Sequence, residues 1–288
     1  MKVLVTGGEG QLARAFTAQA RPGWTVTALA RSALDIADEA AVGAAVDRLR
    51  PDLIVNAAAF TAVDRAEGER AAAFAVNRDG AAHLARAAAK SGASLIHLST
   101  DYVFDGRLGR PYRPGDPPSP LNVYGASKLA GEAAVATADP AALIVRAGWL
   151  YSTHGVNFLT TMLRLMAEGT ELRVVDDQIG APTSAASLAG GLWDLAALKA
   201  TGLMHYADAG VASWCDFAVA IGEEAAAAGL LSEAPRVTPI STAERPGLAA
   251  RPAFSVLDAS LTWNLLGRAA PPWRQVLRGV LAEMAAAR

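Results

Sequence analysis

Cysteine is almost missing from this sequence, since Cys215 is the only one in 288 residues. A single thiol excludes an intramolecular disulfide, and it excludes a metal cage built from several cysteines. Proteins of the reducing cytoplasm typically carry few disulfides, so we expect a cytoplasmic location. The four histidines are scattered along the chain and predict no metal site; they are His83, His97, His154 and His205.

The sequence also lacks an excess of one charge sign and a long hydrophobic run at its start. The formal net charge of −2 gives no electrostatic reason to expect nucleic acid or an acidic membrane as a partner. The opening run Met1–Val5 ends at Thr6-Gly7, which is too short for a signal-peptide core or a membrane span. A phosphate-bearing ligand therefore has to be held by local groups.

Hydrophobic residues are abundant, at 52% of the chain, and their arrangement predicts the fold. In the first half, short β-branched runs alternate with helical patterns, which predicts parallel strands joined by right-handed crossovers. We therefore expect an α/β protein with a Rossmann-type doubly wound parallel sheet. The expected strands are 3–5, 24–29, 53–56, 95–99 and 142–145, and the expected helices are about 11–20, 40–49, 71–90 and 124–136.

The second half is less regular and predicts a smaller C-terminal substrate-binding domain. We place an NAD(P)-binding Rossmann domain at residues 1–148 and a substrate-binding subdomain at 149–288, and we allow elements from about 172–200 to return to the first domain. The expected helices of this half are 158–167, 184–198, 214–228 and 273–287, with a strand at 203–206.

A glycine-rich turn follows the first expected strand. Gly7 and Gly10 fit a Gly-x-x-Gly-x-x-Gly pattern in which Ala13 stands in the third place. Glycine lets the backbone approach a pyrophosphate, and the start of the next helix supplies free N–H groups. The pattern alone also fits an ordinary turn, but its place after the first strand favours dinucleotide binding.

The end of the second expected strand bears on the choice of cofactor. Many NAD-binding chains have a carboxylate there for the adenosine ribose, whereas this chain reads Ala30-Arg31-Ser32. Arg31 could pair with a 2′-phosphate, which favours NADPH and leaves NADH possible. A solvated surface arginine is an equally good interpretation.

Three polar groups are expected near the carboxyl ends of successive strands: Asn56, Thr100, and the pair Tyr124 and Lys128. Tyr124 and Lys128 are four residues apart and share one helix face. The Tyr124 phenol could give a proton to a developing alkoxide, and a nearby ammonium would lower its pKa. Thr100 could hydrogen-bond a substrate carbonyl. A Tyr-x-x-x-Lys pair alone occurs often by chance, but its order after the glycine turn favours catalysis.

With these residues in place, the sequence resembles the extended short-chain dehydrogenase/reductases and, within them, the dTDP-4-dehydrorhamnose reductase family. The similarity runs along nearly the whole chain. It is carried by the segments 55–64, 99–106, 120–132, 146–151 and 177–183, and by Arg251-Pro252 in the last quarter.

The resemblance implies NAD(P)H-dependent reduction of the 4-keto group of dTDP-4-dehydro-L-rhamnose to dTDP-L-rhamnose. It places Thr100, Tyr124 and Lys128 on catalytic positions, and Asp101 and Trp149 on positions that touch the sugar nucleotide. The motifs themselves already point to Gly7 and Arg31 as cofactor contacts. The resemblance adds further cofactor-contacting positions, which are Gly10, Gln11, Leu12, Asp35, Ile36, Ala59, Phe60 and Thr61, together with Tyr124 and Lys128.

Some expectations lie outside the central motifs. Arg251 could donate to a substrate diphosphate as a bidentate group. Some family members dimerise through glutamates that chelate magnesium, but here the matching stretch reads Ala13-Arg14-Ala15, so we expect a monomer or a weak homodimer. Two alternatives stay open: a reductase, epimerase or dehydratase of another nucleotide sugar, and a non-catalytic nucleotide-binding regulatory subunit.

Overall fold

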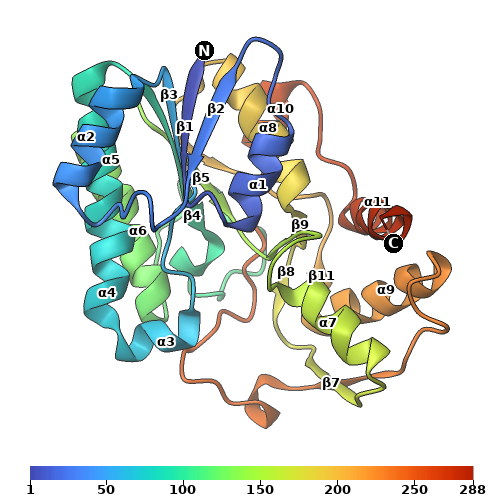
Figure 1. Ribbon diagram of the computed structural model, residues 1–288. Helices are drawn as coiled ribbons and strands as arrows, with labels where there is room; N and C mark the ends of the chain where they lie inside the picture. The colour runs from blue at the N-terminus through green and yellow to red at the C-terminus, as the bar shows by residue number, and fades with distance from the viewer. Residues whose placement is uncertain (288) are drawn as a thin grey trace.

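The centre of the protein is a six-stranded parallel sheet, seen in a computed structural model that describes residues 1–287 (Figure 1). The strand order β10-β5-β4-β3-β1-β2 places β1 between β2 and β3, so the chain reverses its direction of winding beside β1. Ligands of such sheets bind where this reversal occurs, outside the carboxyl ends of the strands. The strands are β1 Lys2–Thr6, β2 Thr25–Leu29, β3 Leu53–Asn56, β4 Ser94–Thr100, β5 Leu143–Ala147 and β10 Gly202–His205.

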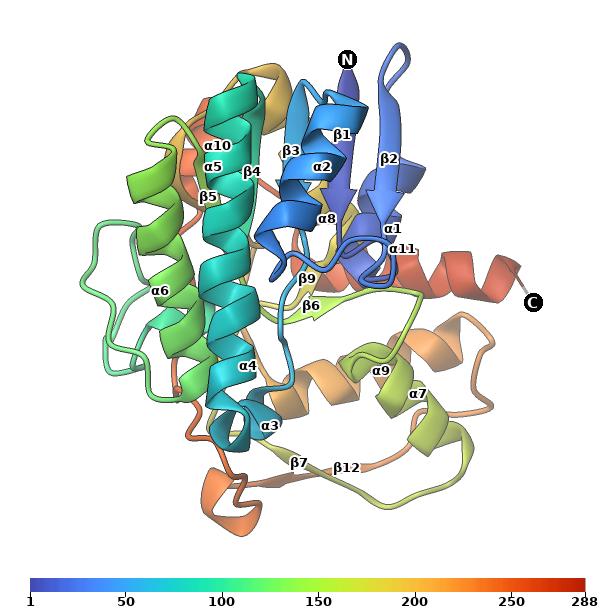
Figure 2. The same cartoon turned by 60° about the vertical axis from the view of Figure 1, so that its left-hand side comes forward.

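Helices cover both faces of the sheet (Figures 1 and 2). On one face, α1 (Gln11–Ala18) packs against α8 (Ala185–Ala197) and buries Leu12 and Phe16 on the sheet. This spacing of four residues is the apolar stripe of a helix that lies on a core. The other face is covered by α2 (Glu39–Leu49), α5 (Ala81–Ser91) and α6 (Val123–Ala138). The doubly wound parallel sheet is therefore confirmed.

A second hydrophobic core lies beyond the carboxyl ends of the strands (Figure 2). It is built from three helices, α7 (Phe158–Ala167), α9 (Trp214–Ala227) and α11 (Trp273–Ala286). Short strand pairs link the segments between them; these are β6 (Leu150–Tyr151) with β9 (Thr183–Ser184), β7 (Leu172–Val175) with β12 (Val237–Ile240), and β8 (Ile179–Gly180) with β11 (Ala212–Ser213). The helix α10 (Ser260–Leu266) returns to β10.

The long helix expected at 71–90 is present over residues 70–91, but a π-helical segment interrupts its regular α-helical turns. The structure has a short α3 (Val63–Gly68), then α4 (Arg70–Phe74), a π-helical segment at Ala75–Gly80, and α5. Inside the π-helical segment, the Asn77 side chain makes hydrogen bonds to the backbone of Phe60 and to Ser127. Such widened turns occur where a helix has to deliver a side chain to a particular partner, and helical periodicity alone does not reveal them.

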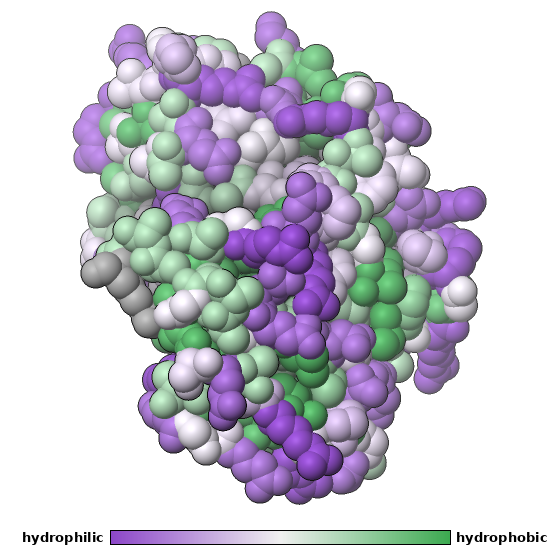
Figure 3. All heavy atoms as spheres, turned by 90° about the vertical axis from the view of Figure 1, so that its right-hand side faces the viewer, coloured by the Kyte–Doolittle hydropathy of each residue, from purple (hydrophilic) through white to green (hydrophobic). Residues whose placement is uncertain are grey.

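Figure 3 shows the face of the protein that includes the end of α11. Hydrophobic residues on this face form separate patches among hydrophilic ones and do not form a continuous band. Within residues 1–287, no helix is both long and apolar enough to cross a membrane. The same residues contain no group of three or more histidine, cysteine, aspartate or glutamate side chains placed to hold a metal ion.

Candidate active site

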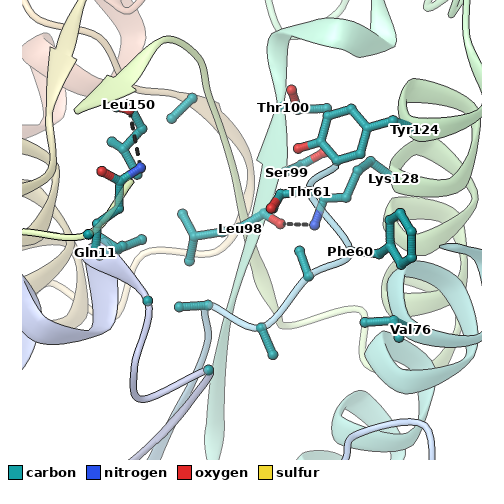
Figure 4. Close-up of a pocket in the computed structure, with 18 of the residues that line it drawn as sticks. Gln11, Phe60, Thr61, Val76, Leu98, Ser99, Thr100, Tyr124, Lys128 and Leu150 are labelled. Atoms are coloured by element: carbon teal, nitrogen blue, oxygen red, sulfur yellow. Dashed lines mark hydrogen bonds between the residues drawn. The ribbon is translucent and has the colours of Figure 1, made fainter. Parts of the chain in front are cut away.

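A cleft of about 730 Å³ lies at the carboxyl ends of β1, β3 and β4, between the sheet and the second core. Most of the residues that the sequence singled out line this cleft. Figure 4 shows Gln11 on one side and Thr100, Tyr124 and Lys128 on the other. The predicted site residues in its lining are Gly7, Gly10, Gln11, Leu12, Arg31, Asp35, Ile36, Ala59, Phe60, Thr61, Thr100, Asp101, Tyr124, Lys128 and Trp149.

The glycine turn is shaped for close approach of a ligand. Gly7 has φ +69°, and a Cβ there would lie 2.9 Å from the Ala57 oxygen, so a side chain is excluded by both conformation and space. Gly10 precedes α1 as its N-cap residue, and no side chain caps this helix. The first N–H groups of α1 thus lie at the cleft, a geometry that suits a pyrophosphate.

Arg31 and Asp35 lie at the outer end of the same cleft. The Arg31 side chain is 76% exposed, and its guanidinium is 3.2 Å from the Asp35 carboxylate. Ile36 is buried against Gly80, where a Cβ would lie 2.7 Å from the Ile36 side chain. This end of the cleft therefore combines the buried apolar side chain of Ile36 with the exposed guanidinium of Arg31.

The loop Ala59–Thr61 is held by Asn77, which sequence reasoning missed. The Asn77 Oδ1 accepts from the Phe60 N–H at 2.8 Å, and its Nδ2 donates to the Phe60 oxygen and to Ser127 Oγ. Asn77 is 1% exposed, and Gly131 of α6 packs directly against the backbone carbonyl oxygen of Asn77. These contacts join the loop to the helix that carries Tyr124. An asparagine in an alanine-rich helical stretch was the only indication in the sequence.

The helix α6 brings Tyr124 and Lys128 to the end of β4. Its N-cap residue Asn122 accepts from the Gly125 N–H at 2.8 Å, which fixes where the helix begins. The oxygens of Thr100 and Tyr124 lie close together in the cleft (Figure 4). The Lys128 ammonium donates to the Leu98 oxygen on β4. The structure thus brings the three predicted catalytic residues together.

The electrostatics of Tyr124 differ from the expectation. Burial raises the pKa of Tyr124 to about 12, with the Thr100 hydrogen bond lowering it and Asp101 raising it in part. Burial also lowers the pKa of Lys128 to about 8, opposed by Glu132. The pKa of Tyr124 therefore shifts in the direction opposite to the expected one, because desolvation of the buried phenol is the largest contribution. A neutral phenol is the form that can donate a proton.

Asp101 is a buried carboxylate beside Thr100. Its Oδ1 accepts from Thr100 Oγ1 at 3.0 Å, and its Oδ2 accepts from Ser255 Oγ at 2.6 Å. Burial raises the pKa of Asp101 to about 6, while the Ser255 and Thr100 hydrogen bonds lower it in part. Thr100 has one proton, which it gives to Asp101, so its oxygen is left to accept a hydrogen bond on the side of the cleft. Ser255 was not predicted, and no motif pointed to it.

Trp149 forms part of the wall of the cleft. Its ring stacks on Trp214 with centroids 3.6 Å apart, and a Cβ on Gly180 would lie 2.2 Å from it. Trp149 has φ +52°, a left-handed conformation that costs a bulky residue about 1–3 kcal/mol. Packing holds this strained backbone at the site. Trp214, a further residue that the sequence analysis missed, supports it from the start of α9.

Arg251 lies differently from the other predicted residues. Its guanidinium is 2.7 Å from the Asp64 carboxylate, and within residues 1–287 it is not part of the cleft lining. It also interacts with the Tyr102 phenol, which does line the cleft and packs edge-on against Tyr124. The structure therefore places Arg251 behind the cleft wall, one side chain away from Tyr124.

Comparisons with known proteins agree with this site. Residues 1–286 match the family model described as RmlD substrate binding domain. A dTDP-4-dehydrorhamnose reductase from Sinorhizobium fredii is 42% identical over 288 residues, covering 96% of this chain and 96% of that protein. A second, from Mycobacterium tuberculosis strain H37Rv, is 44% identical and covers 99% of this chain and 93% of its own.

Solved structures show the same relationship. The dTDP-4-dehydrorhamnose reductase of Bacillus anthracis, solved in complex with NADP, superposes with a TM-score of 0.93 at 37% identity and covers 98% of this chain and 99% of its own. The UDP-glucose 4-epimerase of Thermus thermophilus, in complex with NAD, has a TM-score of 0.84 at 21% identity and shares the fold. The family expected from the sequence is confirmed: the chain belongs to the dTDP-4-dehydrorhamnose reductase family.

Proposed function

We propose that this protein uses NADPH to reduce the 4-keto group of dTDP-4-dehydro-L-rhamnose to dTDP-L-rhamnose. The observation that carries the proposal is the meeting of Thr100, Tyr124 and Lys128 in one cleft with the glycine turn. The names of the relatives and of the NADP-bound structure of the Bacillus anthracis protein support the same reaction and cofactor.

The residues of the cleft fit a dinucleotide. Gly7 lets the turn pass tightly beside the Ala57–Ala58 backbone at the cleft, the start of α1 offers N–H donors to a pyrophosphate, and Lys128 offers an ammonium for a ribose hydroxyl. Arg31 at the rim could turn from Asp35 to a 2′-phosphate, which favours NADPH and still allows NADH. The bound cofactor supplies a hydride to the substrate carbonyl carbon.

Tyr124 donates the proton in this proposal. Its raised pKa keeps the phenol neutral at working pH, so it can pass its proton to the oxygen that becomes an alkoxide. Thr100 and Asp101 position the sugar, and Trp149 closes the wall beside it. We also propose Arg251 as a contact to the substrate diphosphate, for which its guanidinium would have to turn from Asp64 and from behind Tyr102 toward the cleft.

The wider organisation remains part of the proposal. We assign cofactor binding to residues 1–148 and substrate binding to 149–288, with α8 and β10 packed on the first part. We also propose a monomer or weak homodimer that works in the cytoplasm, with a nucleotide sugar as its small-molecule partner. The stretch Ala13-Arg14-Ala15, which offers no carboxylate for a bridging metal, supports the first of these points.

The test is loss of NADPH absorbance when the purified protein is given enzymatically generated dTDP-4-dehydro-L-rhamnose, with the UDP analogue and the free 4-keto sugar as controls. We expect turnover of the dTDP sugar, little turnover of the free sugar, and dTDP-L-rhamnose as the product by NMR. Epimerisation with NAD retained would favour the epimerase alternative. Nucleotide binding without turnover of any 4-keto sugar would favour a regulatory subunit.

A further inference from the structure

The second half of the chain reaches Thr100 through two consecutive hydrogen bonds. Ser255 Oγ donates to Asp101 Oδ2 at 2.6 Å, and Thr100 Oγ1 donates to Asp101 Oδ1 at 3.0 Å. All three residues are at most 4% exposed. Ser255 and Asp101 are 154 positions apart, so only the folded protein brings them together.

The backbone around Ser255 is fixed. Its N–H donates to the Ile179 oxygen at 2.8 Å, and the Ile179 N–H donates to the Ala253 oxygen at 2.8 Å. Ile179 itself belongs to β8, which pairs with β11. The Ser255 hydroxyl is thus held in place by main-chain contacts, which makes it a well-defined donor.

Asp101 has little freedom to turn away from these donors. A Cβ on Gly148 would lie 2.4 Å from the Asp101 Cγ, so the carboxyl group packs directly against the Gly148 backbone. A small cavity lined by Asp101, Ser255 and neighbouring residues has a volume of only about 10 Å³, about the room of one water molecule. The carboxylate therefore has little contact with solvent on that side.

No charged side chain among the groups around Asp101 forms an ion pair with it in residues 1–287. On α6, Lys128 donates to the Leu98 oxygen, and Tyr124 faces Asp101 as a neutral phenol. The next residue along the chain, Tyr102, is also a phenol, and the Arg251 behind it is paired with Asp64. Hydroxyl donors from Thr100 and Ser255, with nearby backbone N–H groups, therefore stabilise the ionised carboxylate.

We propose that Ser255 is a positioning residue of the reductase site, which holds Asp101 as a hydrogen-bond acceptor for Thr100 and for a hydroxyl of the sugar. This inference rests on the proposed function. Without the Ser255 hydroxyl, Asp101 takes up a proton more readily and donates to Thr100 Oγ1, so that this hydrogen bond runs in the opposite direction. Ser255 thereby sets the orientation of the Thr100 hydroxyl beside Tyr124.

The experiment compares Ser255→Ala with Ser255→Thr, which keeps the hydroxyl. A hydrogen bond to a charged group contributes enough to change a rate about tenfold or more, so we expect Ser255→Ala to lower kcat at least tenfold with the KM for NADPH unchanged. The acid limb of the pH profile should move up by about one unit, because the ionised Asp101 loses a donor. Ser255→Thr should keep most of the native kcat and leave the acid limb of the pH profile close to its native position.

Two controls separate positioning from a structural role. Ser213→Ala removes another serine-to-aspartate hydrogen bond, from the buried Ser213 to the exposed Asp176 at 2.6 Å, and neither residue lines the cleft. It should lower stability and leave the pH profile in place. In a variant that already carries Asp101→Asn, Ser255→Ala should lower kcat by less than about twofold more, since the two residues act as a unit.

Turnover of the unmodified protein tests the proposed function separately from the role of Ser255. The carboxyl ¹³C signal of Asp101 can be titrated without substrate, and its midpoint should be higher in Ser255→Ala than in the unmodified protein. An unmoved midpoint, or a native pH profile in Ser255→Ala, would overturn the inference. The inference would also be overturned if Ser255→Ala lowered kcat as much in the Asp101→Asn variant as it does alone.

Discussion

Replacing Asp101 with asparagine should stabilise the protein while removing most of its activity. Burial raises the pKa of Asp101 from 3.8 to about 6, which means that folding disfavours its ionised form. Each pKa unit corresponds to about 1.4 kcal/mol, so the free energy of unfolding loses up to about 3 kcal/mol when Asp101 is ionised. Asparagine has the same shape without the charge, and Thr100 and Ser255 can still hydrogen-bond its amide.

The pH dependence gives this prediction its sign. Because the pKa is raised on folding, the penalty is present in full above about pH 6, shrinks as the pH falls from 6 to 3.8, and is lost below 3.8, where Asp101 is protonated in both states. Urea unfolding should therefore show Asp101→Asn more stable than the unmodified protein at pH 8, by up to about 3 kcal/mol. The difference should shrink steadily toward pH 4.

Asp105 provides a matched control from the same segment. A hydrogen bond from the Tyr112 hydroxyl holds the pKa of Asp105 below its usual value, so its ionised form contributes stability that is lost as the pH falls. Asp105→Asn should thus be less stable than the unmodified protein at pH 8. If Asp101→Asn were destabilised at pH 8, or if its effect were the same at pH 8 and pH 4, the reasoning would be refuted.

Three further substitutions test other parts of the site and its support. Tyr124→Phe should lower kcat about 10²–10⁴-fold and leave NADPH affinity by fluorescence titration nearly unchanged, because only the proton donor is lost; a near-native kcat would exclude Tyr124 as the donor. Arg31→Ala should raise the KM for NADPH about tenfold and hardly change that for NADH, whereas equal changes would show that Arg31 does not contact the 2′-phosphate. In the unmodified protein the buried Arg146 guanidinium is 2.6 Å from the Glu132 carboxylate. Glu132→Ala leaves this buried charge unpaired, which should lower the free energy of unfolding in urea by about 3–5 kcal/mol. The exposed Glu168→Ala control should cost less than about 1 kcal/mol, and a similar small loss in Glu132→Ala would contradict the argument.

The sequence by itself determined the sheet and much of the cleft lining. Strand and helix periodicities are local, and parallel strands joined by crossovers place their carboxyl ends at one edge. Gly7 follows β1, Thr100 ends β4, and Tyr124 lies in the first turn of α6, the α-helix that comes after β4, so their meeting at this edge could be predicted without coordinates. The helical spacing of Tyr124 and Lys128 is equally local.

Only the tertiary structure decided how these residues are supported and charged. The π-helical turn that delivers Asn77 to Phe60, the Ser255 donor on Asp101, and the pairing of Arg251 with Asp64 all join segments far apart in the chain. No local pattern encodes such contacts. The raised pKa of Tyr124 has the same origin, because desolvation depends on how deeply the fold buries the phenol rather than on its distance in sequence from a lysine.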